Sequence, residues 1–156
     1  MPDAQQKLVC FHVGGREMAV PIDQVRETIE LRPITPVFRA PACITGLVNL
    51  RGEILAILDI AQMLGLGVNR RDESSRVVVV DVEVEDQLRS AGLLVDGLGP
   101  IRDIPEDGLS PAPSPFVAAD PALIDGVVSL ESHPLAVLDI ARVLDAPVLA
   151  PFIREG

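Results

Sequence analysis

Aromatic side chains are scarce in this chain. Its 156 residues include no Trp, no Tyr and only 4 Phe. Many proteins that bind single-stranded nucleic acids stack the bases on aromatic side chains, so this composition excludes such a stacking platform. Apolar residues nevertheless make up 48% of the chain. A hydrophobic core must therefore be built mainly from Val, Leu, Ile and Ala.

Positive charge is also scarce. The chain carries 13 Lys and Arg residues against 23 Asp and Glu residues, which gives a net charge of -10. A surface this acidic repels the phosphate backbone of nucleic acids and the headgroups of anionic lipids. The charge balance thus argues against partners that are nucleic acids or membranes, but it does not name the partner.

Long hydrophobic runs are missing. No stretch approaches the roughly 20 apolar residues of a membrane span, and the N-terminal segment MPDAQQK lacks the apolar region of a signal peptide. We therefore expect a cytoplasmic protein with no direct membrane insertion. In that compartment the only cysteines, Cys10 and Cys43, are expected to stay reduced.

The most informative feature that is present is an internal duplication. Residues 41–66 recur as residues 121–146 with an offset of 80 and no gap, and 13 of the 26 aligned positions are identical. Weaker echoes link residues 7–13 with 76–82 and residues 20–25 with 93–98. Such self-similarity indicates tandem copies of one structural unit. Positions that agree between the copies are expected to serve folding, and positions that differ are candidates for function.

The duplication suggests one domain made of two similar β units. The first unit is expected at about residues 7–67 and the second at about 76–146, with tails at 1–6 and 147–156. The sequence leaves open whether strands are exchanged between them.

Short runs of β-forming residues separated by turn signals predict an all-β fold. Asp59 and Asp139 occupy equivalent positions, where each is expected to cap a short helix. Five strands in each unit would close as two small barrels, because an open sheet of that size exposes its edges. The expected strands are 8–13, 17–20, 28–31, 44–50 and 54–58 in the first unit, and 76–83, 91–95, 100–104, 124–130 and 135–138 in the second.

Residues that could carry chemistry are few. The only histidines, His12 and His133, form no recognisable arrangement with a nucleophile. Cys10, His12 and Cys43 could in principle hold zinc, but structural zinc sites usually show paired Cys or His clusters, so ordinary packing is the preferred interpretation. We expect no enzymatic activity, no cofactor and no metal.

The copies differ most between the last two strands of each unit. The first copy reads NLRGE at residues 49–53, whereas the second reads SLESH at residues 129–133. Gly52 permits a tight turn that would present Arg51 from a rigid hairpin. Two interpretations of Arg51 remain open: a solvated side chain, or a residue for docking or internal pairing.

Several segments resemble the CheW-like family of chemotaxis adaptor (coupling) proteins over about residues 7–146. They are FHVGGREMAVPIDQVRE, ITGLVNLRGEILAILDI, SAGLLVDGLGPIRDIP, GLSPAPS and IDGVVSLESHPLAVLDIARVL, in the family order. The resemblance implies two five-stranded SH3-like barrels packed together, with no cofactor and no catalysis. It also implies a scaffold that couples the regulatory domain of a CheA-type histidine kinase to the cytoplasmic tip of methyl-accepting chemoreceptors. Such an adaptor is expected to be a monomer when alone and to be recruited to membrane-associated receptor arrays.

The resemblance also assigns roles to particular residues. Val25 and Glu27 match the partner-binding face of the family, and Arg51 matches an arginine that supports that face and pairs with Glu27. Ile44 and Gly46 match positions near the kinase contact. The remaining expected partner-binding residues are Asn49 and Gly52, in the NLRG string, and Leu94, Val95 and Asp96, on the second unit's side of a receptor groove.

Two alternatives stay open. The chain could be a diverged CheW-like β-barrel module that binds a different regulatory protein outside a receptor array. It could also be a small enzyme or metal protein, in which case replacement of Cys10, His12 or Cys43 should matter.

Overall fold

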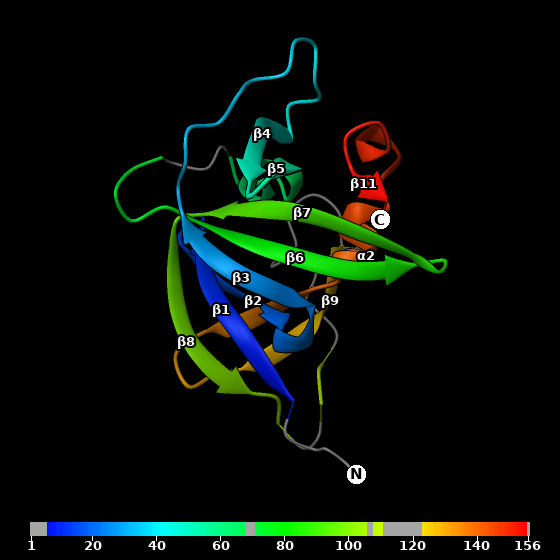
Figure 1. Ribbon diagram of the computed structural model, residues 1–156. Helices are drawn as coiled ribbons and strands as arrows, with labels where there is room; N and C mark the ends of the chain where they lie inside the picture. The colour runs from blue at the N-terminus through cyan, green and yellow to red at the C-terminus, as the bar shows by residue number, and fades with distance from the viewer. Residues whose placement is uncertain (1–5, 68–70, 106–107, 111–122, 156) are drawn as a thin grey trace.

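The computed structural model describes residues 6–67, 71–105, 108–110 and 123–155 (Figure 1). Two sheets and a few short helical segments account for the regular structure of this part of the chain. The expected all-β class, with two five-stranded sheets and short helices, is confirmed.

Each sheet follows one path of five strands. The first sheet has the order β8 (Gly97–Asp103), β1 (Lys7–Val13), β2 (Arg16–Pro21), β10 (Pro134–Leu138) and β9 (Ile124–Ser129). The second has the order β3 (Val25–Glu30), β6 (Arg76–Val84), β7 (Gln87–Val95), β5 (Glu53–Asp59) and β4 (Ile44–Leu50), and the short β11 (Arg154–Glu155) pairs with β7.

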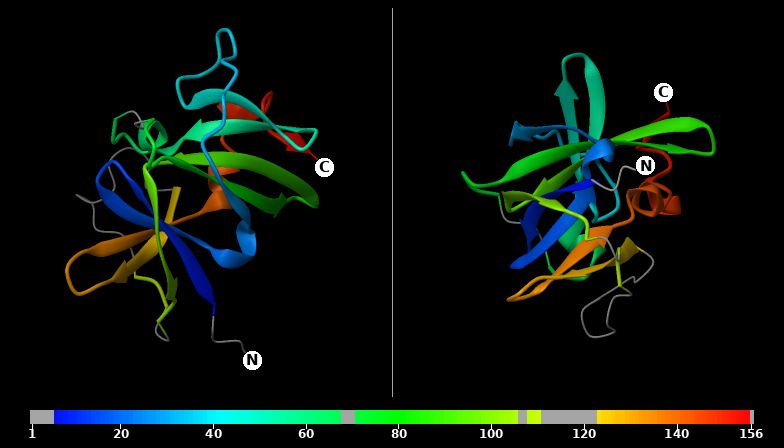
Figure 2. Two further views of the ribbon diagram at one scale, coloured as in Figure 1. Left: turned by 60° about the vertical axis from the view of Figure 1, so that its left-hand side comes forward. Right: turned by 90° about the horizontal axis from the view of Figure 1, so that it is seen from below.

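Strands are exchanged between the two halves of the chain. The first sheet joins β1 and β2 with three strands of the second half, and the second sheet joins β3, β4 and β5 with β6 and β7. The parallel pairs β2–β10 and β5–β7 join the two halves, as do the antiparallel pairs β1–β8 and β3–β6. In Figure 2 the orange β10 accordingly lies beside the blue N-terminal strands. The repeated stretch of sequence is thus not a separate unit in space.

Three clusters of buried side chains form the core. The largest joins the two sheets and contains residues of both, such as Phe11 and Leu138 from the first sheet and Leu58 and Leu93 from the second. A smaller cluster lies within each sheet, around Ile57 in one and Leu135 in the other. Each sheet therefore curves around its own core and shares a third with its neighbour.

The predicted helix caps are confirmed. Asp59 precedes α1 (Ile60–Met63), and its Oδ1 accepts a hydrogen bond from the Gln62 amide at 3.0 Å. Asp139 precedes α2 (Ile140–Leu144), and its Oδ1 accepts one from the Arg142 amide at 3.2 Å. The 3₁₀ turn η1 (Ile22–Gln24) follows Pro21, the last residue of β2, whose fixed φ suits the start of a helical turn.

The C-terminal segment has regular structure. The sequence predicts a tail from residue 147, but residues 147–155 form the 3₁₀ turn η4 (Pro147–Leu149) and then β11. Leu149 is fully buried and Ile153 nearly so. This apolar pair anchors the segment to the core. Most of the segment between β8 and β9 lies outside the described residues.

Candidate functional site

The hairpin of β4 and β5 ends in a two-residue turn. The φ angles of Arg51 and Gly52 are 51° and 90°, so both residues are left-handed, as hairpin turns that follow the strand twist require. The Asn49 side-chain oxygen accepts a hydrogen bond from the Gly52 amide at 2.8 Å. The NLRG string thus builds a rigid turn that fixes the Arg51 backbone at its tip.

Arg51 forms a two-pronged ion pair with Glu27 of β3. Both guanidinium–carboxylate distances are 2.8 Å, which confirms the expected pairing. The Arg51 side chain is 67% exposed, whereas that of Glu27 is 25% exposed. The hydrogen bonds from Arg51 hold the pKa of Glu27 below its ordinary value, so both groups are charged at neutral pH. An ion pair this exposed adds little to stability, and its main effect is to fix a charged surface shape.

A β-bulge positions Glu27. Val25 lies opposite Val80 and Glu27 lies opposite Val79, so Arg26 is an extra residue in β3. A bulge of this kind redirects the side chains around it. The bulge lets the consecutive residues Arg26 and Glu27 of β3 reach two different sets of partners.

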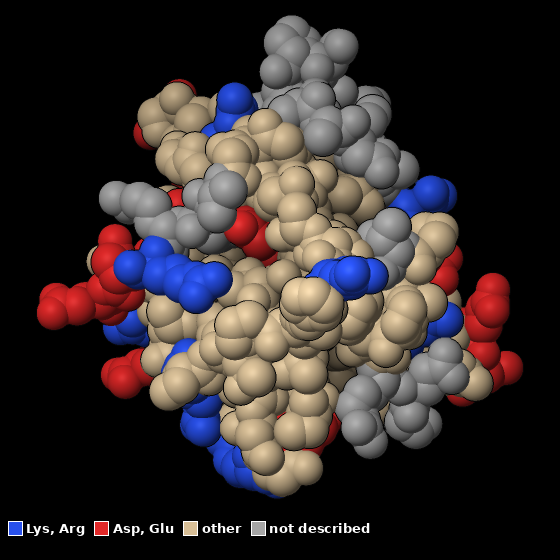
Figure 3. All heavy atoms as spheres, turned by 90° about the horizontal axis from the view of Figure 1, so that it is seen from above, with Lys and Arg blue, Asp and Glu red and all other residues tan. Residues whose placement is uncertain are grey.

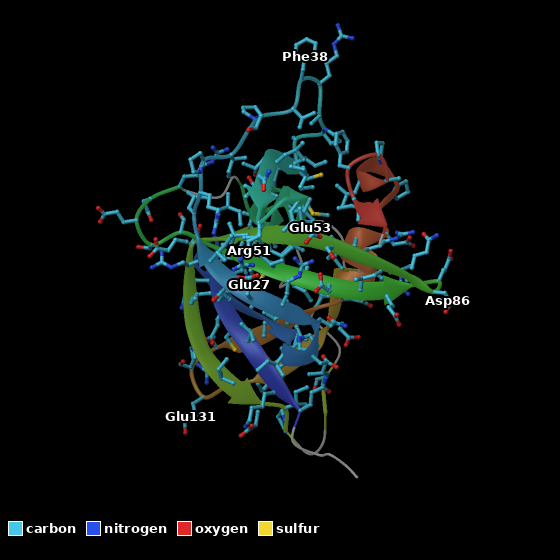
Figure 4. All side chains as sticks on the ribbon, viewed as in Figure 1. Glu27, Phe38, Arg51, Glu53, Asp86 and Glu131 are labelled. Carbon is cyan, nitrogen blue, oxygen red and sulfur yellow. The ribbon has the colours of Figure 1, made fainter. Side chains whose placement is uncertain are left out.

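Arg26 is the centre of a second ion-pair network, which was not predicted from the sequence. Its guanidinium lies 2.7 Å from Glu53 of β5 and 2.8 Å from Asp81 of β6, and it donates to the Ser90 hydroxyl of β7 at 3.2 Å. Hydrogen bonds to Asp81 and Glu53 raise the pKa of Arg26. One arginine thereby ties β3 to three other strands. In Figure 4, Glu27, Arg51 and Glu53 lie close together.

A groove runs beside the Glu27–Arg51 pair. It has a volume of about 550 Å³ and follows β3 into the segment after it. Charged and apolar side chains alternate along it. Its lining consists of Glu27, Thr28, Ile29, Glu30, Leu31, Arg32, Pro33 and Arg51.

Other expected site residues on the same sheet lie inward. Val25 is half-buried and packs against the core, and Ile44 is 6% exposed. Gly46 is buried where Thr35 crosses over β4, and a Cβ there would lie 2.4 Å from the Thr35 carbonyl oxygen. Ile44 and Gly46 therefore shape β4 and present no side chain to a partner.

Leu94 and Val95, expected on the second unit's side of a receptor groove, lie in the core. They are 1% and 0% exposed and contribute to different core clusters, because β7 lies in the interior of its sheet and is covered on both faces. Asp96 is partly exposed and anchors a turn, since its Oδ2 accepts a hydrogen bond from the Gly14 amide at 2.9 Å. These three residues do not join the Glu27–Arg51 pair.

The cysteines lie apart in the core. Cys10 belongs to the cluster of the first sheet and Cys43 to the cluster between the sheets. Burial, followed by the charge of Glu17, raises the pKa of Cys10 to about 11, so its thiol stays protonated. Across the residues with a described position, no three His, Cys, Asp or Glu side chains gather in a way that could hold a metal ion. Nor does any described helix have the length and apolar character needed to cross a membrane.

With this geometry in view, comparison with known proteins identifies the family. The family model described as CheW-like domain matches residues 7–148. The chain belongs to the CheW-like family. Members of this family are non-enzymatic scaffold and adaptor proteins of chemotaxis, and this chain is such an adaptor.

Individual relatives agree over most of the chain. The chemotaxis protein CheW of Rhizobium meliloti (strain 1021) is 30% identical over 138 residues, covering 88% of this chain and 86% of its own. The protein FrzA of Myxococcus xanthus is 32% identical over 133 residues, covering 85% and 80%. The crystal structure of the scaffolding protein TtCheW from Thermoanaerobacter tengcongensis matches with a TM-score of 0.80 and 26% identity, covering 95% of this chain and 92% of that one.

Proposed function

We propose that this adaptor couples the regulatory domain of a CheA-type histidine kinase to the cytoplasmic tip of methyl-accepting chemoreceptors. The observation that carries the proposal is the two-pronged ion pair of Glu27 and Arg51, called here the Glu27–Arg51 clamp. Its arginine is displayed on a rigid turn, in a chain of the CheW-like family. A scaffold acts by holding its partners in a fixed geometry, so its binding face must be preorganised before they arrive.

The partner-binding face would consist of the clamp and its surroundings. Glu27 and Arg51 present a paired charge at the surface, and Asn49 and Gly52 hold the turn that carries it. Val25 supplies a partly exposed apolar group on the same strand as Glu27. An apolar centre with a charged rim is the usual composition of a protein interface.

The buried residues would act indirectly. Ile44 and Gly46 fix the position of β4, the first strand of the hairpin. Leu94 and Val95 fix β7, the central strand of the same sheet. We assign Asp96 to holding the turn at Gly14. Replacement of these residues should weaken partner binding only through the fold.

Recruitment tests the proposal directly. Receptor signalling fragments assembled on vesicles are sedimented with the kinase, with or without this protein, and the kinase in the pellet is measured. We expect wild-type protein to bring the kinase down and Val25→Asp, checked for folding by circular dichroism, to do so poorly. A folded wild type that recruits no kinase and does not bind receptors contradicts the proposal and favours the diverged module that binds another regulatory protein.

A further inference from the structure

The loop between β3 and β4 projects an aromatic side chain into solvent. Phe38 is 86% exposed, and the next most exposed large hydrophobic residue of the described chain, Ile101, is 53% exposed. Figure 4 shows Phe38 at the end of this loop, away from the sheets. A chain with only 4 Phe therefore places one of them where it contributes nothing to the core.

The loop is held firmly at its base. Thr35 and Leu47 exchange two backbone hydrogen bonds of 2.9 and 2.8 Å, and Gly46 allows this close approach. Pro36 and Pro41 flank the tip and restrict the backbone on both sides. The position of Phe38 is thus set by the fold, and little ordering is needed when it binds.

Arg39 completes the tip. Its φ angle is 63°, and the left-handed conformation brings its guanidinium over the Phe38 ring, 5.3 Å from the ring centre. A cation on one face of the ring leaves the other face and the edge for a partner. Aromatic residues and arginines are the residues most often found to dominate protein interfaces.

Charge around the tip is opposite to that of the whole molecule. Residues 31–50 contain two arginines, Arg32 and Arg39, and no Asp or Glu, in a chain with a net charge of -10. Figure 3, which views this end from above, shows a largely uncharged face with separate Lys and Arg side chains and with most Asp and Glu at its margins. Such a surface attracts a partner that is itself acidic.

We propose that Phe38 and Arg39 form an anchor for a partner protein that offers an apolar pocket with a carboxylate at its rim. The ring fills the pocket and Arg39 pairs with the carboxylate. An anionic membrane is disfavoured because the protein as a whole is strongly acidic. A second copy is disfavoured because two copies of a chain with a net charge of -10 repel each other.

The inference rests on the proposed function, because the kinase and receptor fragments serve as probes. The chain has no Trp, so Phe38→Trp labelled with fluorotryptophan gives one fluorine resonance from the tip. We expect that resonance to shift when either the kinase or the receptor fragment binds. The matched control, Ile101→Trp on β8, should not shift. Phe38→Ala and Arg39→Glu should each weaken binding about tenfold or more, and Ile101→Ala should not.

The outcomes separate the two proposals. If wild type binds neither fragment, the proposed function fails and this inference fails with it. If wild type binds but the fluorine resonance of the labelled Phe38→Trp variant stays unchanged in the complex, and Phe38→Ala binds normally, only the anchor is overturned. A shift produced equally by anionic vesicles, or by concentrating the protein alone, also overturns it, in favour of a lipid or a second copy.

Discussion

In the β4–β5 hairpin, Arg51 reaches along the surface to Glu27, and 67% of the arginine side chain remains exposed. In the equivalent β9–β10 hairpin, His133 instead turns towards Glu17 of β2, whose side chain is only 5% exposed. The Nε2–Oε1 distance of that pair is 2.7 Å. One copy of the duplicated hairpin displays its ion pair, and the other uses a polar pair to hold two strands together.

The buried pair is part of a larger cluster. Arg102 of β8 also reaches Glu17, with an Nε–Oε2 distance of 2.8 Å, and the Ser132 hydroxyl lies 2.8 Å from Nδ1 of His133. Burial alone would raise the pKa of Glu17, but hydrogen bonds with Arg102 and His133 outweigh burial and hold it below the ordinary value. Glu17 is therefore ionised and structural, whereas Glu27 is ionised and available to a partner.

Features common to both copies serve the fold. Gly46 lies under the crossing segment at Thr35, and Gly126 lies under an equivalent crossing at Ser110, each crossing being fixed by two backbone hydrogen bonds. Asp59 and Asp139 cap equivalent helices. Comparison of the copies thus separates structural residues from displayed ones, and substitutions can test that division.

The largest expected effect is at Gly46. A Cβ there would lie 2.4 Å from the Thr35 carbonyl and 2.5 Å from Ile34, so Gly46→Ala must displace the crossing segment. We expect it to lower the free energy of unfolding by about 3 kcal/mol, measured by urea denaturation. The control is Gly52→Ala, which has open space and only the left-handed backbone against it, at a cost of about 1 kcal/mol. Equal losses would contradict the structural role of Gly46.

The second-largest loss of stability is expected for substitution of Glu17. Glu17→Gln removes the charge that Arg102 and His133 share, at a side chain that is 5% exposed. Loss of buried hydrogen bonds to charged groups should lower the free energy of unfolding by about 2 kcal/mol. Glu27→Gln, the matched change at the surface pair, should leave the denaturation midpoint unchanged. A loss at Glu27 as large as that at Glu17 would remove the distinction between the two pairs.

The effect of Glu17→Gln on the free energy of unfolding should depend on pH. Because the folded-state pKa of Glu17 lies below the unfolded value of 4.5, its charge stabilises the fold above that pH, and the contribution is lost as the pH falls through the folded pKa. The difference in unfolding free energy between wild type and Glu17→Gln should therefore shrink as the pH falls below 4.5. A difference that grew over this acidic range would show that the ionised form does not stabilise the cluster.

Loss of the helix-capping aspartates should have the smallest effect on stability, and the effect should be equal in the two copies. Asp59→Ala and Asp139→Ala each remove one cap hydrogen bond from a short helix. Each should lower the free energy of unfolding by about 1 kcal/mol in thermal or urea denaturation. A much larger loss in one copy would mean that the equivalent aspartates have diverged in role.

Much of the division between residues that serve the fold and residues displayed at the surface could be predicted from the sequence. The repeat identified Asp59 and Asp139 as caps because a capping carboxylate acts within one turn of its own helix. The Arg51–Gly52 turn could be predicted for the same reason, since a two-residue hairpin depends on local backbone preferences. The all-β class followed from short β-forming runs, which are also local signals.

The long-range features could not be predicted. The two units have similar strands, so the sequence could not decide whether β6 and β7 pair only within their own half or also with β3 and β5. Burial of Leu94 and Val95 on opposite faces depends on that choice, because it places β7 inside the second sheet. The Arg26 network depends on it too, since Asp81 and Ser90 reach Arg26 only after the exchange.

One measurement tests the central claim most directly: titration of the kinase regulatory domain and of a receptor signalling fragment with charge-reversed hairpins. Arg51→Glu breaks the displayed clamp, and Glu131→Arg makes the opposite reversal at the equivalent, exposed position of the other copy, which Figure 4 places at the far end of the molecule. We expect Arg51→Glu to weaken binding of at least one fragment about tenfold or more while its denaturation midpoint is unchanged. Glu131→Arg should bind as wild type does. If folded Arg51→Glu bound both fragments as tightly as wild type and Glu131→Arg do, the assignment of the Glu27–Arg51 clamp as the partner-binding face would be contradicted.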